Sequence, residues 1–541
     1  GDLVIPLEDP QEGIRIAPIT GQFAVEIQEN LSMKGSLDIP KLAQVSLDYS
    51  KDVLDFEGKE IAIDGLLQKQ LKPLKLGASP SRALKIENIK GQVRPSEKGR
   101  ELDAKAGFAN GASLNLDGVI KEDGKYRFTI ALKDYGIYPL MEGLVKDYEF
   151  GDIIKTLSLD KAKLIALPKQ LQLEDLLSSM GEKTSITGKA TLDTSNGLGN
   201  FGSGSHLKVK VNGGDLFDLI GQSPNAQLSG DLQGRLNISK TPLSPLIAGK
   251  LHSPQLQYQY STTPKIPLEK VLARLHYENL VLSLESLTAK LFGGSLEGSG
   301  EANLKVTPFS FKWNLSSVEI HLDQVVKDIA PLNQHVRGVI KAKSQGEGSG
   351  VSLNSLRAES FLEAKELRLE NAAQFFLPNL EGEKKTISMV SKGLKPILAK
   401  RKKGNLVFND MESKVTMEKG KLKLEDFSHK GEVSLDTKGL AFDVQKGNIG
   451  GLCRFSLPLG DERKIELPLS LGGKLLSPEF SLDASKIKAQ LKKEALDTIG
   501  KKLRGKSVDP KAAQEKVNEK LREVEDKLGK KVGETLGDLF R

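Results

Sequence analysis

The sequence predicts a mainly β protein: an elongated, twisted antiparallel sheet of repeating strands, with short interspersed helices and a helical C-terminal tail. Most of residues 14–484 alternate polar and apolar side chains with a period of two. Gly, Asn, Asp and Pro interrupt this alternation about every 8–12 residues, as turns do between successive short strands. The composition agrees, because 53 glycines, 38% hydrophobic and 5% aromatic residues suit a thin sheet with many turns.

The clearest alternation predicts strands with one strongly apolar face. Residues 309–315 place two phenylalanines, a tryptophan and a leucine on the same side of a strand. The leucines of residues 467–471 and the pair Phe455 and Leu457 follow the same rule. Such a face either lines an open groove or packs beneath a helix, and alternation alone leaves both possibilities open.

Helical spacing appears in three places. Apolar residues three or four apart predict short helices over Tyr138–Lys146 and Leu322–Ile329. From about Asp483 the pattern becomes helical, with Ile487, Leu491, Ile499 and Leu503 on one stripe and a second seam between Val517 and Val532. Residues 485–541 hold 16 Lys/Arg and 10 Asp/Glu, whereas the whole chain has a net charge of +8. The tail is therefore basic and amphipathic, and it either lies on an anionic membrane or caps the end of the sheet.

An internal repeat supports the repetitive architecture. The segments around Gly111 and Gly294 resemble each other, and so do the strands around Phe128 and Phe311. Both pairs are separated by 183 residues, an offset that two unrelated landmarks share only by chance.

The chemistry-bearing residues predict neither an enzyme nor a cofactor site. The single cysteine, Cys453, excludes an internal disulfide and is expected to be a buried, inert thiol. His321 and His335 lack a third ligand at metal-site spacing, and no serine occupies a GxSxG turn. Apart from its tail the chain is nearly neutral, which argues against a nucleic-acid groove. The basic run at residues 400–403 fits a solvated loop better than a site for lipid head groups.

Four segments resemble, in the same order, the C-terminal region of the AsmA-like family. These are Leu287–Gly300, Gly338–Gly350 with Leu353–Leu369, Phe408–Leu422 and Leu467–Phe480. The resemblance covers about residues 270–484, and upstream the chain has the general repetitive β style of AsmA and TamB proteins. It divides the chain into a repetitive β region at 1–269, an AsmA-like region at 270–484 and the tail at 485–541.

This resemblance implies a repeating β-groove whose apolar inner face handles phospholipid or another acyl lipid between inner and outer membranes. It further implies outer-membrane biogenesis in the periplasm of a Gram-negative bacterium, with anchoring to the inner membrane by a segment missing from this chain. The alternative is a structural or assembly factor for outer-membrane proteins that carries no lipid. The lipid-groove candidates are Leu291, Leu296, Phe309, Phe311, Trp313, Leu315, Phe455, Leu457, Leu467, Leu469 and Leu471.

Overall fold

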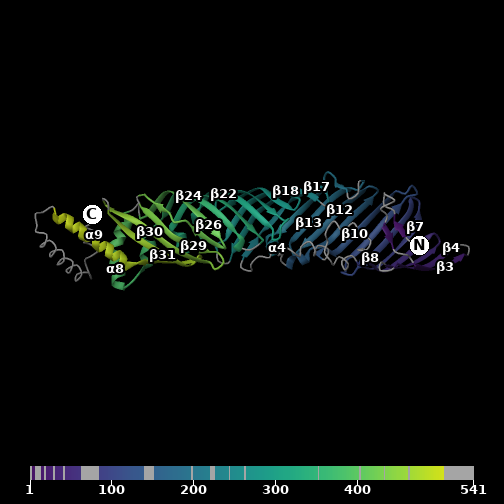
Figure 1. Ribbon diagram of the computed structural model, residues 1–541, viewed down its shortest axis with the longest axis horizontal. Helices are drawn as coiled ribbons and strands as arrows, with labels where there is room; N and C mark the ends of the chain where they lie inside the picture. Colours follow the sequence, from purple (N-terminus) through teal and green to yellow (C-terminus); the bar gives the residue numbers. More distant parts are fainter. Residues whose placement is uncertain are drawn as a thin grey trace.

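A computed structural model confirms the predicted fold class: one long, twisted β-sheet with few helices (Figure 1). It describes residues 3–5, 14–16, 20–27, 31–39, 43–62, 85–138, 152–195, 199–219, 226–242, 244–260, 263–350, 353–400, 404–431, 433–460 and 463–504. The predicted helix at Tyr138–Lys146 beyond Tyr138, the second seam of the tail and the run Arg401–Lys403 lie outside these residues.

The strands follow one another along the molecule, because most of them are joined by tight turns. A first pair, β1 (Leu3–Ile5) and β2 (Ile14–Ile16), is separate from the main sheet. The first half of the main sheet contains β3 (Thr20–Ile27), β4 (Leu31–Ile39), β5 (Ala43–Ser50), β6 (Val53–Ala62), β7 (Lys85–Ser96), β8 (Gly99–Phe108), β9 (Ser113–Ile120), β10 (Tyr126–Gly136), β11 (Ser158–Leu167), β12 (Gln170–Met180), β13 (Thr184–Asp193), β14 (Asn200–Phe201), β15 (His206–Asn212), β16 (Ala226–Ser229) and β17 (Asp231–Thr241). The second half contains β18 (Ser244–Tyr260), β19 (Ile266–Glu278), β20 (Val281–Leu291), β21 (Gly294–Asn303), β22 (Ser310–His321), β23 (Val336–Ser349), β24 (Arg357–Leu369), β25 (Leu380–Glu381), β26 (Leu406–Glu418), β27 (Lys421–Leu424), β28 (Ser428–His429), β29 (Ser434–Asp443), β30 (Asn448–Gly460), β31 (Arg463–Lys474) and β32 (Ser477–Asp483).

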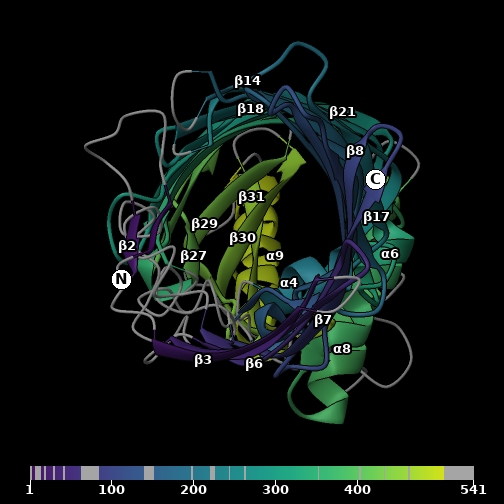
Figure 2. The same cartoon turned by 90° about the vertical axis from the view of Figure 1, so that its right-hand side faces the viewer.

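Antiparallel pairing carries the sheet from β3 to β32, with the short strands β14, β16 and β28 at its margins. One parallel pairing, between β25 and β32, ends the sheet. No pairing joins β3 to β32 in the described part of the chain, so the sheet is open. Seen along its long axis, it curls around itself (Figure 2), as strongly twisted sheets do. The strand β19 spans the sequence boundary at residues 269 and 270, and the sheet continues through it.

Within the described part of the chain, the helices are short except for two at the C-terminal end. They are α4 (Gly213–Leu219), α5 (Leu322–Val325), α6 (Leu332–His335), α7 (Ala372–Phe376), α8 (Lys384–Ala399) and α9 (Ala484–Arg504), with 3-10 turns η2 (Asp152–Thr156), η3 (Leu353–Ser355) and η4 (Leu377–Asn379). The helix predicted over Leu322–Ile329 is real but ends at Val325. The next residue, Val326, has φ −93° and ψ 5°, outside the helical region, so the helix stops there.

The α9 helix confirms the predicted start of the C-terminal helical segment, and α8 was not predicted. Ile487 and Leu491 of α9 are buried, as their stripe predicted. The buried face of α8 includes Val390, Leu394 and Leu398. These helices and α7 pack on the last strands and form the largest core of the described residues.

Candidate functional site

One face of the sheet carries an unbroken row of apolar residues and glycines. In an antiparallel sheet, directly opposed residues lie on the same face, so the pairings trace a row from strand to strand. From β5 to β30 this row contains Val45, Gly58, Ile89, Ala106, Leu114, Leu132, Ala162, Leu176, Gly188, Leu207, Leu236, Gly249, Leu275, Leu284, Gly300, Trp313, Gly346, Ala358, Met417, Leu422, Phe442 and Ile449. No charged or polar side chain interrupts it.

The neighbouring row, one residue along each strand, points to the opposite face and is charged. Between β21 and β29 it alternates in sign through Glu301, Lys312, Glu347, Arg357, Glu418, Lys421 and Asp443. Lys312 Nζ lies 3.3 Å from a carboxylate oxygen of Glu301. Opposed charges of this kind stabilise neighbouring strands by about 0.2–1 kcal/mol per pair, and they keep this face in water.

The apolar face is the concave one, because its side chains bury one another without a second layer. Val209, Leu251 and Ala273 are each 8% exposed, and every residue in their cluster belongs to a strand. A second cluster, around Leu256 and Val271, is likewise made of strand residues alone. In a single-layer sheet, side chains converge in this way only on the inside of a curl. We call the apolar face from β5 to β24 the groove.

The predicted groove residues around Trp313 lie on this face. The rings of Phe309, Phe311 and Trp313 follow one another with centroids 6.0 and 5.9 Å apart, and all three side chains are partly exposed. Leu315 is also partly exposed. Leu291 and Leu296 join the strand-only cluster that Leu315 contacts, and Leu296 is 9% exposed. The structure therefore brings these six candidates together on one stretch of the groove.

Glycines complete this stretch, a role that the alternation of the sequence does not predict for them. Trp313 is opposed by Gly300 on one side and Gly346 on the other, Leu315 by Gly298, and Phe311 by Gly348. Each missing side chain leaves room for the large one that faces it. The sequence does contain a signal for this role, because its glycines lie two residues apart in Gly298–Gly300 and Gly346–Gly348. Glycine also marks turns, so this spacing alone did not reveal the role.

The candidates near the C-terminus belong instead to a packed core. Leu457 and Leu467 are 0% exposed, Leu469 4% and Phe455 8%, and all four lie in the cluster with α7, α8 and α9. The ring centroids of Phe376 and Phe455 are 5.1 Å apart. Here the helices cover the apolar face, so these four side chains are core residues rather than lining of an open groove. Leu471 is partly exposed.

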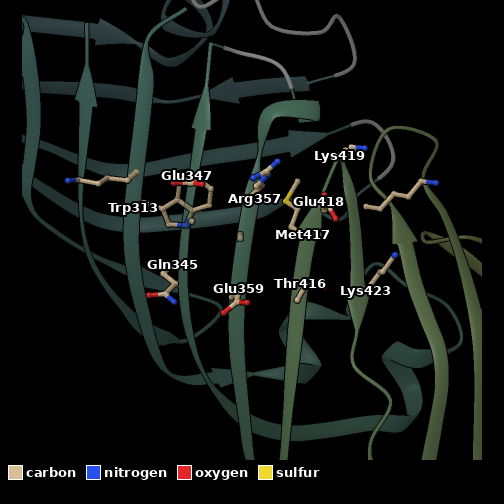
Figure 3. Close-up of a pocket in the computed structure, with 14 residues that line it drawn as sticks. Trp313, Gln345, Glu347, Arg357, Glu359, Thr416, Met417, Glu418, Lys419 and Lys423 are labelled. Atoms are coloured by element: carbon tan, nitrogen blue, oxygen red, sulfur yellow. The ribbon is translucent and has the colours of Figure 1, made fainter. Parts of the chain in front are cut away.

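A broad depression on the opposite face has a different character. It has a volume of about 810 Å³ and follows the charged row between Lys312 and Lys421, and Trp313 and Met417 of the apolar row also reach its lining (Figure 3). Gln345, Glu359, Thr416 and Lys423 form its second polar row. Charged and polar side chains on neighbouring strands make up most of its lining, so it suits water and ions better than acyl chains.

The structure gives the surroundings of two titratable residues that stood out in the sequence, His335 and Cys453. His335 is buried, its Nδ1 lies 2.8 Å from the carbonyl oxygen of Glu370, and its ring packs on Phe375. Burial raises the pKa of the Cys453 thiol to about 11. Among the described residues no group of His, Cys, Asp or Glu is arranged to hold a metal ion. No described helix has the length and apolarity needed to span a bilayer.

Comparison with known proteins finds no matching family model, curated protein or solved structure. The AsmA-like resemblance therefore stays a prediction from the sequence motifs.

Proposed function

We propose that the protein is a non-enzymatic carrier that binds the acyl chains of phospholipid in the groove and lets them move along it. The observation that supports this proposal best is the unbroken apolar row. An acyl chain lying across the strands would meet no charge from β5 to β24, so no ionised group would have to be desolvated along its way.

The energetics favour a lipid as the occupant. Each methylene removed from water contributes about 0.8 kcal/mol, so two chains of ordinary length could be held while the head group stays in solvent. The ring of Trp313 is partly exposed, and the neighbouring rings of Phe311 and Phe309 extend this apolar surface. From the resemblance to the AsmA-like motifs we infer that this carrier works in the Gram-negative periplasm, between the two membranes and in support of outer-membrane biogenesis.

Mild purification followed by native mass spectrometry tests the proposal. The wild-type chain should carry phospholipid. Trp313→Glu places a charge on the groove and should remove the bound lipid while the circular dichroism of the sheet is retained. Asn314→Glu is the matched control, because it adds the same charge to the next residue, on the opposite and exposed face.

Absence of lipid from the wild-type chain would contradict the carrier and favour the assembly factor that binds none. Loss of folding in Trp313→Glu, with lipid still bound to other groove variants, would mean that Trp313 belongs to a packed core.

A further inference from the structure

The α8 helix carries a stripe of lysines that the core does not use. Lys384, Lys385, Lys392 and Lys395 are all exposed, and at 100° per residue they fall within about a quarter of the helix circumference. None of the four makes an ion pair in the part of the chain that the structure describes. The sequence of α8 contains no Asp or Glu. We call these four residues the lysine stripe.

Two of these lysines occupy positions that a helix disfavours. Lys384 and Lys385 lie in the first turn, where the partial positive charge of the helix N-terminus repels cations. The first turn itself has no acidic residue. The N-cap residue is Glu383, and its side chain makes no capping hydrogen bond. Helix stability therefore does not account for this charge, and an anionic partner would.

The opposite side of α8 is already occupied. Val390, Leu394, Ile397 and Leu398 are at most 6% exposed and pack in the C-terminal core. The helix therefore has no apolar face left to insert into a bilayer or to offer to another helix. Whatever binds the stripe must be attracted by charge.

We infer that the lysine stripe docks the C-terminal end of the molecule on the anionic phosphate surface of a membrane. Lysine suits this partner because it is a compact point charge that tolerates a fluid array of phosphates. A nucleic acid is disfavoured, since α8 presents no aromatic ring on which a base could stack. Figure 1 shows α8 at the C-terminal end of the sheet, where helices cover the apolar face, and at the opposite end from the N-terminal strands. This inference deepens the proposed function by assigning the end of the groove that faces a membrane.

Vesicle flotation of the full chain tests it. Vesicles that mix phosphatidylglycerol with phosphatidylcholine should bind the protein, and vesicles of phosphatidylcholine alone should not. Replacing the four lysines by glutamine should weaken binding by roughly 600-fold, since each lysine near an anionic surface contributes roughly fivefold. Added salt should weaken wild-type binding, because the charges are exposed.

Three further variants separate docking through the stripe from an effect of net charge and from an effect on the groove. The control changes Lys90, Lys105, Lys208 and Lys250, four exposed lysines elsewhere on the sheet, to glutamine and should bind as the wild type does. Lysine-to-arginine changes in the stripe should also preserve binding. Trp313→Glu should still float with anionic vesicles, so the groove and the stripe can fail independently. Wild-type affinity in the four-glutamine variant, or equal binding to neutral vesicles, would overturn the inference.

Discussion

The indole of Trp313 lies over Gly346, its partner on the next strand. A Cβ atom at Gly346 would come within 2.3 Å of Cζ2 of the indole, closer than two carbon atoms can approach. The backbone of Gly346 does not have the positive φ that requires glycine. Glycine at this position therefore leaves space for the indole and for the carbonyl oxygen of Arg357, which a Cβ atom would approach to 2.7 Å.

Gly346→Ala should displace the Trp313 ring and destabilise the sheet by about 1–3 kcal/mol, as overpacking does. Trp313 is the single tryptophan of the chain, so its emission should shift to the red in the variant. Urea unfolding followed by fluorescence measures both effects. Gly472→Ala is the control, because a Cβ there meets nothing within 4 Å, and it should leave emission and stability nearly unchanged.

Core and groove leucines should respond differently to truncation. Leu467 is fully buried under the helices, and Leu467→Ala should cost about 2–5 kcal/mol of unfolding free energy. Leu315→Ala should cost less than half as much, because Leu315 is partly exposed on the groove. The order of the two effects should reverse for lipid binding. The Leu315 variant should lose bound phospholipid, and the Leu467 variant should keep it. Equal destabilisation of the two would mean that the groove is packed.

The Cys453 thiol should react slowly in the folded protein. With its pKa raised to about 11 by burial, the thiolate fraction at pH 8 is about two orders of magnitude below that of a free cysteine. Reaction with a disulfide reagent should speed up as pH rises toward that pKa. Urea should accelerate it by unfolding the C-terminal core. Fast labelling at pH 8 without denaturant would show that the helices leave this core open.

Local patterns sufficed to predict the strands and the start of α9. Period two was visible because successive side chains of a strand face opposite sides, and the stripe of Ile487 and Leu491 was visible because α9 buries one face. The α8 helix was missed because Gly393 and Pro396 disfavour helix within it. Gly393 is buried, and Pro396 is tolerated in the last turns, where little of the helix follows it.

Which apolar faces form the groove could not be predicted from alternation alone. Phe408 and Met411 are three residues apart, so strict alternation would separate them, yet both contact the C-terminal core. Asp410 between them has a φ of 50°, which marks a local irregularity where side chains change faces. The helices that cover Leu467 but leave Trp313 uncovered come together only through long-range packing, which no local pattern reports.

Quenching of Trp313 fluorescence by phospholipids brominated on their acyl chains tests the central claim most directly. Because Trp313 is the single tryptophan and lies on the groove, acyl chains bound there should quench its emission strongly. A Trp313→Phe, Asn314→Trp variant moves the reporter to the charged face, where the same lipid should quench weakly. Binding of brominated lipid without quenching of Trp313, or equal quenching on both faces, would contradict an acyl-chain groove.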